Sequence, residues 1–154
     1  MTNATLTRDE ADRIAAEYRA ACRAKFGDAW QQPSDATVLR WAMDEVTEYA
    51  DAVAKFIATG ERDEAAMFKE VSDVIYLLMQ IESDDLRREA ATVIRIPSRY
   101  APFTNPTALE VYRAVHRDNL RRIETATIGP DGKIEKAKDY DKSALMREIE
   151  GIVK

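Results

Sequence analysis

The stretch that decides the fold is Lys69–Met79, KEVSDVIYLLM, which combines an apolar helix with two acidic residues. From Val71 onward the stretch is almost continuously apolar, which is typical of a helix buried in a protein interior. Glu70 and Asp73 nevertheless lie three residues apart, and therefore on the same face of that helix. Because an unpaired buried carboxylate is very costly, the pattern predicts that a cation compensates the two acids.

A preceding segment, Ala42–Ala52 (AMDEVTEYADA), repeats this combination. Asp44 and Glu48 are four residues apart and Glu45 and Glu48 are three apart, so helical spacing places these acids on one side. If the two helices pack as antiparallel neighbours, the acids of one helix face those of the other. The sequence therefore predicts that five carboxylates converge on one cavity, where their repulsion raises several pKa values unless cations bind.

The residue types in this cluster favour a hard divalent cation. His116 is the only histidine of the chain, and the sequence has no Glu-x-x-His pair of the kind found in di-iron carboxylate bundles. An all-oxygen set of ligands selects Mg²⁺, with Mn²⁺ as the alternative. Mg²⁺ commonly shares its coordination with substrate phosphates, so the acids predict a phosphate-bearing substrate. The competing interpretation is that acids at this spacing decorate a solvated helix face, which is their usual place.

Composition excludes several classes of protein. The 154 residues are 45% hydrophobic and 33% charged, which predicts a single domain, 1–154, with a sizeable core. The one cysteine, Cys22, leaves no intramolecular disulfide, and the N-terminus has no signal-peptide pattern, so the chain is expected in the cytoplasm. No apolar run reaches the ~18 residues of a membrane span, and no membrane partner is expected.

The net charge of −5 is unevenly distributed. Residues 1–112 carry 13 Lys/Arg against 20 Asp/Glu, whereas residues 113–138 carry 7 against 4. A nucleic-acid duplex requires a broad basic face, so it is not expected as a partner. An acidic body with one basic segment suits a small anionic ligand held between metal-loaded acids and a few cations.

Hydrophobic periodicity and capping residues predict an all-α fold. Short links between long amphipathic segments favour antiparallel neighbours. Pro130, Asp131 and Gly132 mark a tight turn or small hairpin near the C-terminus. The predicted fold is therefore an antiparallel bundle of four or five helices, with residues 82–106 as an insertion or connector. The helices are expected over residues 7–26, 36–59, 63–83, 107–124 and 141–153.

Two blocks of the sequence resemble one known family. The spacing of Glu45 and Glu48, followed by that of Glu70 and Asp73, resembles the metal signature of the all-α nucleoside triphosphate pyrophosphohydrolases, the MazG-like group. The segments VHRDNLRR and DGKIEKAKDY resemble the C-terminal pattern of MazG-like house-cleaning enzymes. The likeness is greatest to dimeric members that act on dUTP and related deoxynucleotides. The matching positions of the second block are Val115, His116, Asn119, Arg121 or Arg122, Asp131, Gly132, Lys133, Lys136, Tyr140 and Leu145.

The resemblance implies a homodimeric, Mg²⁺-dependent enzyme that hydrolyses a (deoxy)nucleoside triphosphate, with dUTP or dCTP preferred, to the monophosphate and pyrophosphate. Asp44 or Glu45 would accept the proton of the attacking water. The implied metal ligands are Glu45, Glu48, Glu70 and Asp73. The candidates for substrate binding are Asn119, Arg121, Arg122, Lys133, Lys136 and Tyr140.

Other substrates and roles remain open for the same fold. They are phosphoribosyl-ATP, a (p)ppGpp-type alarmone or modified nucleotide, and a non-catalytic binding or regulatory module. The segment 82–106 is longer than the connection usual in the family, which leaves room for a lid or an altered dimer contact. Arg121 or Arg122 stands where the family has Lys, and the pattern does not choose between them.

Overall fold

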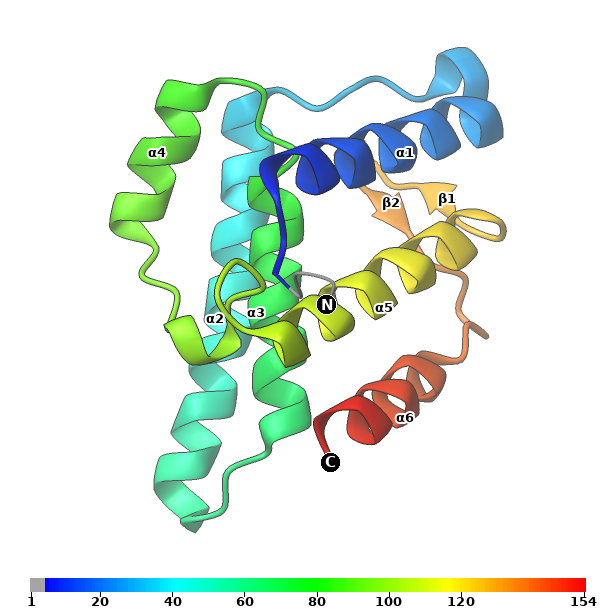
Figure 1. The fold of residues 1–154 in the computed structure, drawn as a ribbon. Helices are drawn as coiled ribbons and strands as arrows, with labels where there is room; N and C mark the ends of the chain where they lie inside the picture. Colours follow the sequence, from blue (N-terminus) through cyan, green and yellow to red (C-terminus); the bar gives the residue numbers. More distant parts are fainter. Residues whose placement is uncertain (1–4) are drawn as a thin grey trace.

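The described part of the chain is predominantly helical, which confirms the all-α class. The computed structural model describes residues 5–154, which form six α-helices, two 3₁₀-helices and one two-stranded antiparallel sheet (Figure 1). None of the described helices is long and apolar enough to cross a lipid bilayer. The elements are α1 (Arg8–Phe26), α2 (Asp35–Thr59), α3 (Glu64–Leu78), α4 (Asp84–Val93), α5 (Pro106–Ile123), α6 (Lys142–Val153), β1 (Thr127–Ile128), β2 (Ile134–Glu135) and the 3₁₀-helices Gly27–Ala29 and Ser98–Tyr100.

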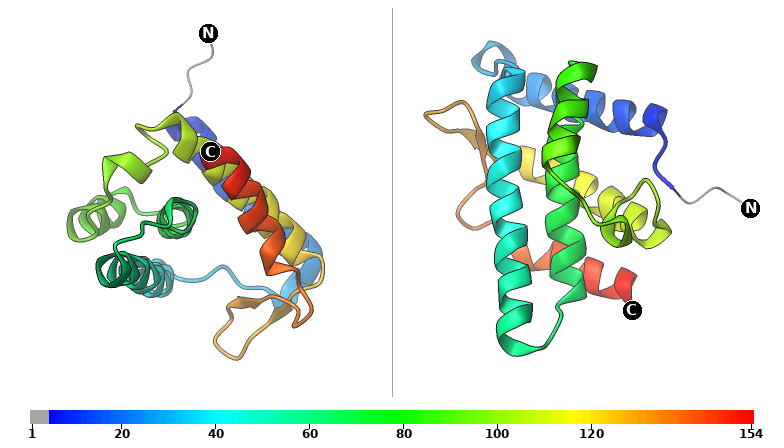
Figure 2. Two further views of the ribbon diagram at one scale, coloured as in Figure 1. Left: turned by 90° about the horizontal axis from the view of Figure 1, so that it is seen from below. Right: turned by 90° about the vertical axis from the view of Figure 1, so that its left-hand side faces the viewer.

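An antiparallel pair of helices, α2 and α3, forms one side of the fold. The Oγ of Ser34 accepts a hydrogen bond from the backbone N–H of Thr37, and this cap begins α2. Gly60 ends α2 with a left-handed φ of 74°, a conformation that side chains disfavour. Asp63 caps α3 four residues after the end of α2, so the chain reverses at once and lays α3 alongside α2 (Figure 2). The acidic faces of the two helices are thereby brought together.

The helices form two layers around the core. In Figure 2, α2 and α3 run side by side, and α1, α5 and α6 cross them on one side. The main core lies between these layers, where Ile14 of α1, Ile75 of α3 and Tyr112 of α5 are at most 2% exposed. Fully burying a large apolar side chain contributes about 1.5–3 kcal/mol, so these contacts hold the crossing helices in place.

The third helix is shorter than the sequence predicts. The apolar pattern favours a helix to residue 83, but α3 ends at Leu78. The carboxylate of Asp35, at the start of α2, accepts hydrogen bonds of 3.0 and 3.2 Å from the backbone N–H groups of Glu82 and Ser83. This contact between distant parts of the chain holds the segment after α3 in a turn.

The insertion predicted at residues 82–106 contains a helix of its own. Ser83 caps α4, so the described chain has six α-helices rather than the four or five expected. Ala90 and Ile94 pack against Val38 of α2 and Leu78 of α3 in a second apolar cluster. The insertion therefore packs against α2 and α3 and stabilises their pairing.

The hairpin predicted near the C-terminus is present as β1 and β2. Gly132 lies in its turn with a φ of 82°. Ile128 and Ile134 pack beside Trp30, and Lys133 Nζ lies 5.7 Å from the centre of the Trp41 ring. The hairpin thus carries part of the basic segment to the start of α2.

Candidate metal centre

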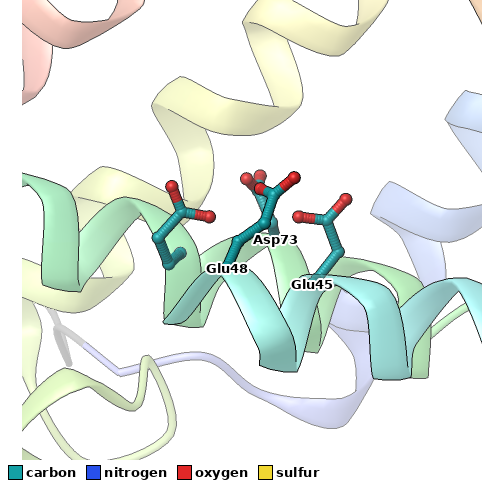
Figure 3. Close-up of side chains that lie close together, drawn as sticks. Glu45, Glu48 and Asp73 are labelled. Carbon is teal, nitrogen blue, oxygen red and sulfur yellow. The ribbon is translucent and has the colours of Figure 1, made fainter. Parts of the chain in front are cut away.

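Four carboxylates from α2 and α3 meet on one side of the helix pair. Glu45 and Glu48 are one turn apart on α2, and Glu70 and Asp73 are one turn apart on α3. One oxygen from each residue lies within 4.8 Å of those of the others. Figure 3 shows that the carboxylates of Glu45, Glu48 and Asp73 point to the same space. The predicted convergence of acids from two helices is therefore present.

The fifth predicted acid, Asp44, does not join this group. Its side chain is exposed, lies outside the cluster of four, and does not line the adjoining cavity. Consecutive residues of an α-helix are rotated by about 100°, so Asp44 is turned away when Glu45 faces α3. The expectation of five converging carboxylates is corrected to four, and Glu45 is the acid of this pair that lies at the site.

The arrangement disfavours the ionised forms of three of these acids. Burial, together with the Asp73 and Glu48 carboxylates, raises the pKa of Glu45 from 4.5 to about 8. Burial raises the pKa of Glu70 to about 7, although Lys69 opposes it. Burial also raises the pKa of Asp73, again against the effect of Lys69. Without a divalent cation the cluster therefore retains protons near neutral pH.

Lys69 is a cation of the site that the spacing of the acids alone does not predict. Its Nζ lies 2.8 Å from Asp73 Oδ2 and 3.6 Å from Glu70 Oε1, and its side chain is 26% exposed. Burial by itself would lower the pKa of Lys69, but the two carboxylates outweigh burial and raise it. The i, i+4 spacing of Lys69 and Asp73 was the available signal, because it brings opposite charges together on a helix.

The donor set fits a hard divalent cation. Glu70 Oε2 is buried and has no hydrogen-bond partner among the described residues. A buried oxygen of this kind normally has a partner, and a cation bound among the acids would supply one. Lys69 supplies a single positive charge to four carboxylates, and carboxylate oxygens are the ligands that Mg²⁺ and Mn²⁺ prefer. The four acids could therefore hold a metal ion.

A cavity of about 330 Å³ adjoins the acids. Three of the four acids line it, together with most of the residues predicted to bind substrate. Burial lowers the pKa of Lys136, and Arg122 lowers it further, so positive charge is concentrated in this wall. The cavity thus combines acidic and basic walls. Its charged and amide-bearing lining includes Glu45, Glu48, Asp73, Lys69, Asn119, Arg122, Lys133 and Lys136.

Arg121 and Tyr140, also predicted to bind substrate, do not line this cavity. Tyr140 Oη donates a hydrogen bond to Asp118 Oδ1 at 2.5 Å, and Arg121 Nη2 donates to the same oxygen at 3.4 Å. Asp118 is 3% exposed, so the two bonds satisfy a buried carboxylate. Of the two adjacent arginines, it is Arg122 that borders the cavity, because neighbouring helical residues point in different directions.

The rest of the lining includes aromatic rings, among them Trp30, Trp41 and Tyr76. Tyr76 Oη lies 2.7 Å from His116 Nδ1, and His116 Nε2 lies 2.7 Å from Glu17 Oε2. His116 is only 6% exposed, and these contacts give both of its ring nitrogens partners within the fold. The histidine therefore supports the wall of the cavity through Tyr76.

Comparison of the chain with protein-family models, with curated proteins and with solved structures found no match. The family resemblance of the sequence pattern accordingly stays a prediction. That the site could hold a metal ion rests on its own geometry, namely four carboxylate oxygens within 4.8 Å of one another and, among the described residues, a buried Glu70 Oε2 without a hydrogen-bond partner.

Proposed function

We propose that the chain is a Mg²⁺-dependent pyrophosphohydrolase of (deoxy)nucleoside triphosphates, with dUTP or dCTP as the preferred substrate and Mn²⁺ as an alternative ion. The observation that carries the proposal is the group of four carboxylates beside a cavity, in which Glu70 Oε2 is buried and has no hydrogen-bond partner among the described residues. Acids that only decorated a solvated helix face would have their oxygens in water. The MazG-like spacing of the same four acids supports a triphosphate as the substrate.

The acids of the site would serve the metal and the attacking water. The ion supplies positive charge that offsets the repulsion between a triphosphate and its nucleophile. Glu45 lines the cavity and would accept the proton that the attacking water loses. The residues that would hold the ion are Glu45, Glu48, Glu70 and Asp73.

The basic and aromatic walls would hold the substrate. Arg122, Lys133 and Lys136 are the cations available to bind phosphate oxygens and the departing pyrophosphate. Attack at the α-phosphorus breaks the bond to the bridging oxygen, so the products are the nucleoside monophosphate and pyrophosphate. Trp30 and Trp41 are aromatic residues of the lining and would be the candidates for contact with the base.

We also propose, from the same resemblance, that the enzyme is a cytoplasmic homodimer. Met43 and Ile57 are 41% and 76% exposed on α2, which supplies apolar surface for contact between two copies. Sedimentation equilibrium at micromolar concentration is expected to give twice the mass of the chain. A monomer at that concentration would contradict the dimer without bearing on the metal site.

Release of pyrophosphate tests the proposed reaction. The substrates compared are dUTP, dCTP, the other nucleoside triphosphates, phosphoribosyl-ATP and ppGpp, each with Mg²⁺, Mn²⁺ or EDTA. We expect release from a deoxynucleoside triphosphate with Mg²⁺ and none with EDTA. Glu70→Gln is expected to lower the rate at least about 100-fold, because even residues that support metal ligands indirectly are worth 10–100-fold.

The matched control is Glu89→Gln, which makes the same chemical change at an exposed position of α4 outside the cavity. This variant is expected to keep the wild-type rate. Turnover that persists in EDTA, or in Glu70→Gln, would refute the metal assignment. Nucleotide binding without turnover of any substrate would instead support the regulatory module.

A further inference from the structure

Lys69 pairs with two of the four carboxylates, so a metal ion that bound their oxygens would compete with it. Its ammonium contacts Asp73 Oδ2 at 2.8 Å and lies 3.6 Å from Glu70 Oε1. The same side chain borders the cavity. These two acids therefore already have a resident cation, whereas Glu70 Oε2 has no partner among the described residues.

We propose that Lys69 is an exchangeable counter-ion of the metal centre and a ligand of the triphosphate. It pairs with Asp73 and Glu70 until a divalent ion takes their oxygens, and it then turns its ammonium towards the phosphates in the cavity. The inference rests on the proposed function, since it requires a metal ion and a polyphosphate at one site.

The positions of the charges support the exchange. The four acidic oxygens lie within 4.8 Å of one another, and Lys69 contacts one of those acids directly. A divalent ion among them and the ammonium would therefore repel each other at short range, where partial exclusion of water strengthens the repulsion. The four-carbon stem of lysine rotates freely, so the ammonium can leave Asp73 without a change in α3.

The cavity supplies a destination for the displaced ammonium. Lys69 lines it together with Arg122 and Lys136, so these three cations border one cavity. Burial lowers the pKa of Lys136, and Arg122, Lys142 and Lys69 lower it further, which indicates that the cations repel one another. A polyphosphate in this space relieves that repulsion and attracts all three side chains.

The exchange makes metal binding and phosphate binding depend on each other. Without phosphate, the charge of Lys69 opposes the metal ion. When phosphate is present, the ammonium of Lys69 pairs with it and no longer opposes the binding of the metal ion. Each ligand is therefore expected to strengthen the binding of the other by the same factor. If Lys69 only stabilised the fold by pairing with the acids, its loss would weaken the binding of both the metal ion and the phosphate.

Calorimetric titration with Mn²⁺ alone tests the first half of the proposal. At about pH 8, where protons compete less for the acids than at neutral pH, Lys69→Met is expected to bind Mn²⁺ about tenfold more tightly than the wild type, or about 1.4 kcal/mol. Lys69→Arg keeps the charge and is expected to bind Mn²⁺ as the wild type does. Lys55→Met removes the same charge from an exposed position of α2 outside the cavity, and it is expected to leave the affinity unchanged.

Titration with inorganic tripolyphosphate at saturating Mn²⁺ tests the second half. Lys69→Met is expected to bind tripolyphosphate about tenfold more weakly, and Lys69→Arg is expected to restore most of the affinity. Mn²⁺ binding that is unchanged or weaker in Lys69→Met would overturn the proposal, and so would unchanged binding of tripolyphosphate. Neither titration requires turnover. If the wild type releases pyrophosphate but Lys69→Met shows no gain in Mn²⁺ affinity, the role of Lys69 fails while the proposed function stands.

Discussion

Raising the pH of the metal-free protein is expected to destabilise it. In the folded protein, burial and neighbouring carboxylates raise the pKa of Glu45 to about 8 and that of Glu70 to about 7, from the ordinary value of 4.5. The unfolded chain loses these protons near pH 4.5, whereas the folded protein keeps them until the pH reaches 7 or 8. Between those limits the folded state binds more protons, so the free energy of unfolding falls as the pH rises.

The magnitude follows from the same values. A pKa of about 8 in place of 4.5 for Glu45 alone corresponds to about 5 kcal/mol once both states are ionised. These acids are partly exposed, and solvent screening reduces the effect, so we expect a loss of about 2 kcal/mol between about pH 5.5 and about pH 8.5. A bound divalent ion offsets the repulsion, so millimolar Mg²⁺ is expected to remove most of the loss.

Urea unfolding at several pH values, in EDTA and in Mg²⁺, measures this effect. Glu45→Gln cannot ionise and is expected to remove much of the pH dependence in EDTA, whereas Glu89→Gln on α4 is expected to retain it. Acids whose pKa is lowered, such as Glu10 beside Arg113, change stability only below about pH 5, which is outside the range from about pH 5.5 to about pH 8.5. If the free energy of unfolding of the metal-free protein stayed constant or rose over this pH range, the folded protein would not be retaining the protons of Glu45 and Glu70.

Three further predictions concern the fold and are checked by urea unfolding at one pH. Ile75→Ala removes a side chain that is 0% exposed and is expected to cost about 3 kcal/mol; a cost below about 1 kcal/mol would contradict its place in the core. Tyr112→Phe removes a buried hydroxyl without a hydrogen-bond partner in the described chain and is expected to stabilise the protein by about 1 kcal/mol, so a clear loss would reveal an unseen partner. Ser34→Ala removes the cap of α2 and is expected to cost about 1 kcal/mol, whereas no effect would show that the cap is dispensable.

Local sequence signals predict the ends of a helix where the residues that cap it are its neighbours in the sequence. Residues 36–59 were expected to be helical and α2 spans Asp35–Thr59, because its cap and its terminal glycine are both adjacent in sequence. The end of α3 was misplaced because apolar residues continue to Ile81 while the chain already turns. That turn is held by Asp35, about 47 residues away, a contact that periodicity does not contain.

The acidic site was predictable in outline, and its details depended on packing. Spacing alone placed Glu45 and Glu48 on one face, but it placed Asp44 there as well. Only the rotation of α2 against α3 decides which acids face inward. The choice of Arg122 over Arg121 depended in the same way on the orientation of α5. The spacing of the acids does not include Lys69, although its i, i+4 spacing to Asp73 predicts an ion pair.

Divalent ions are expected to bind among the four clustered carboxylates. Anomalous diffraction from a crystal of the wild type soaked in Mn²⁺ would locate them. We expect an anomalous peak surrounded by oxygens of Glu45, Glu48, Glu70 and Asp73. The absence of a peak there at saturating Mn²⁺, or a peak only elsewhere on the chain, would contradict this expectation.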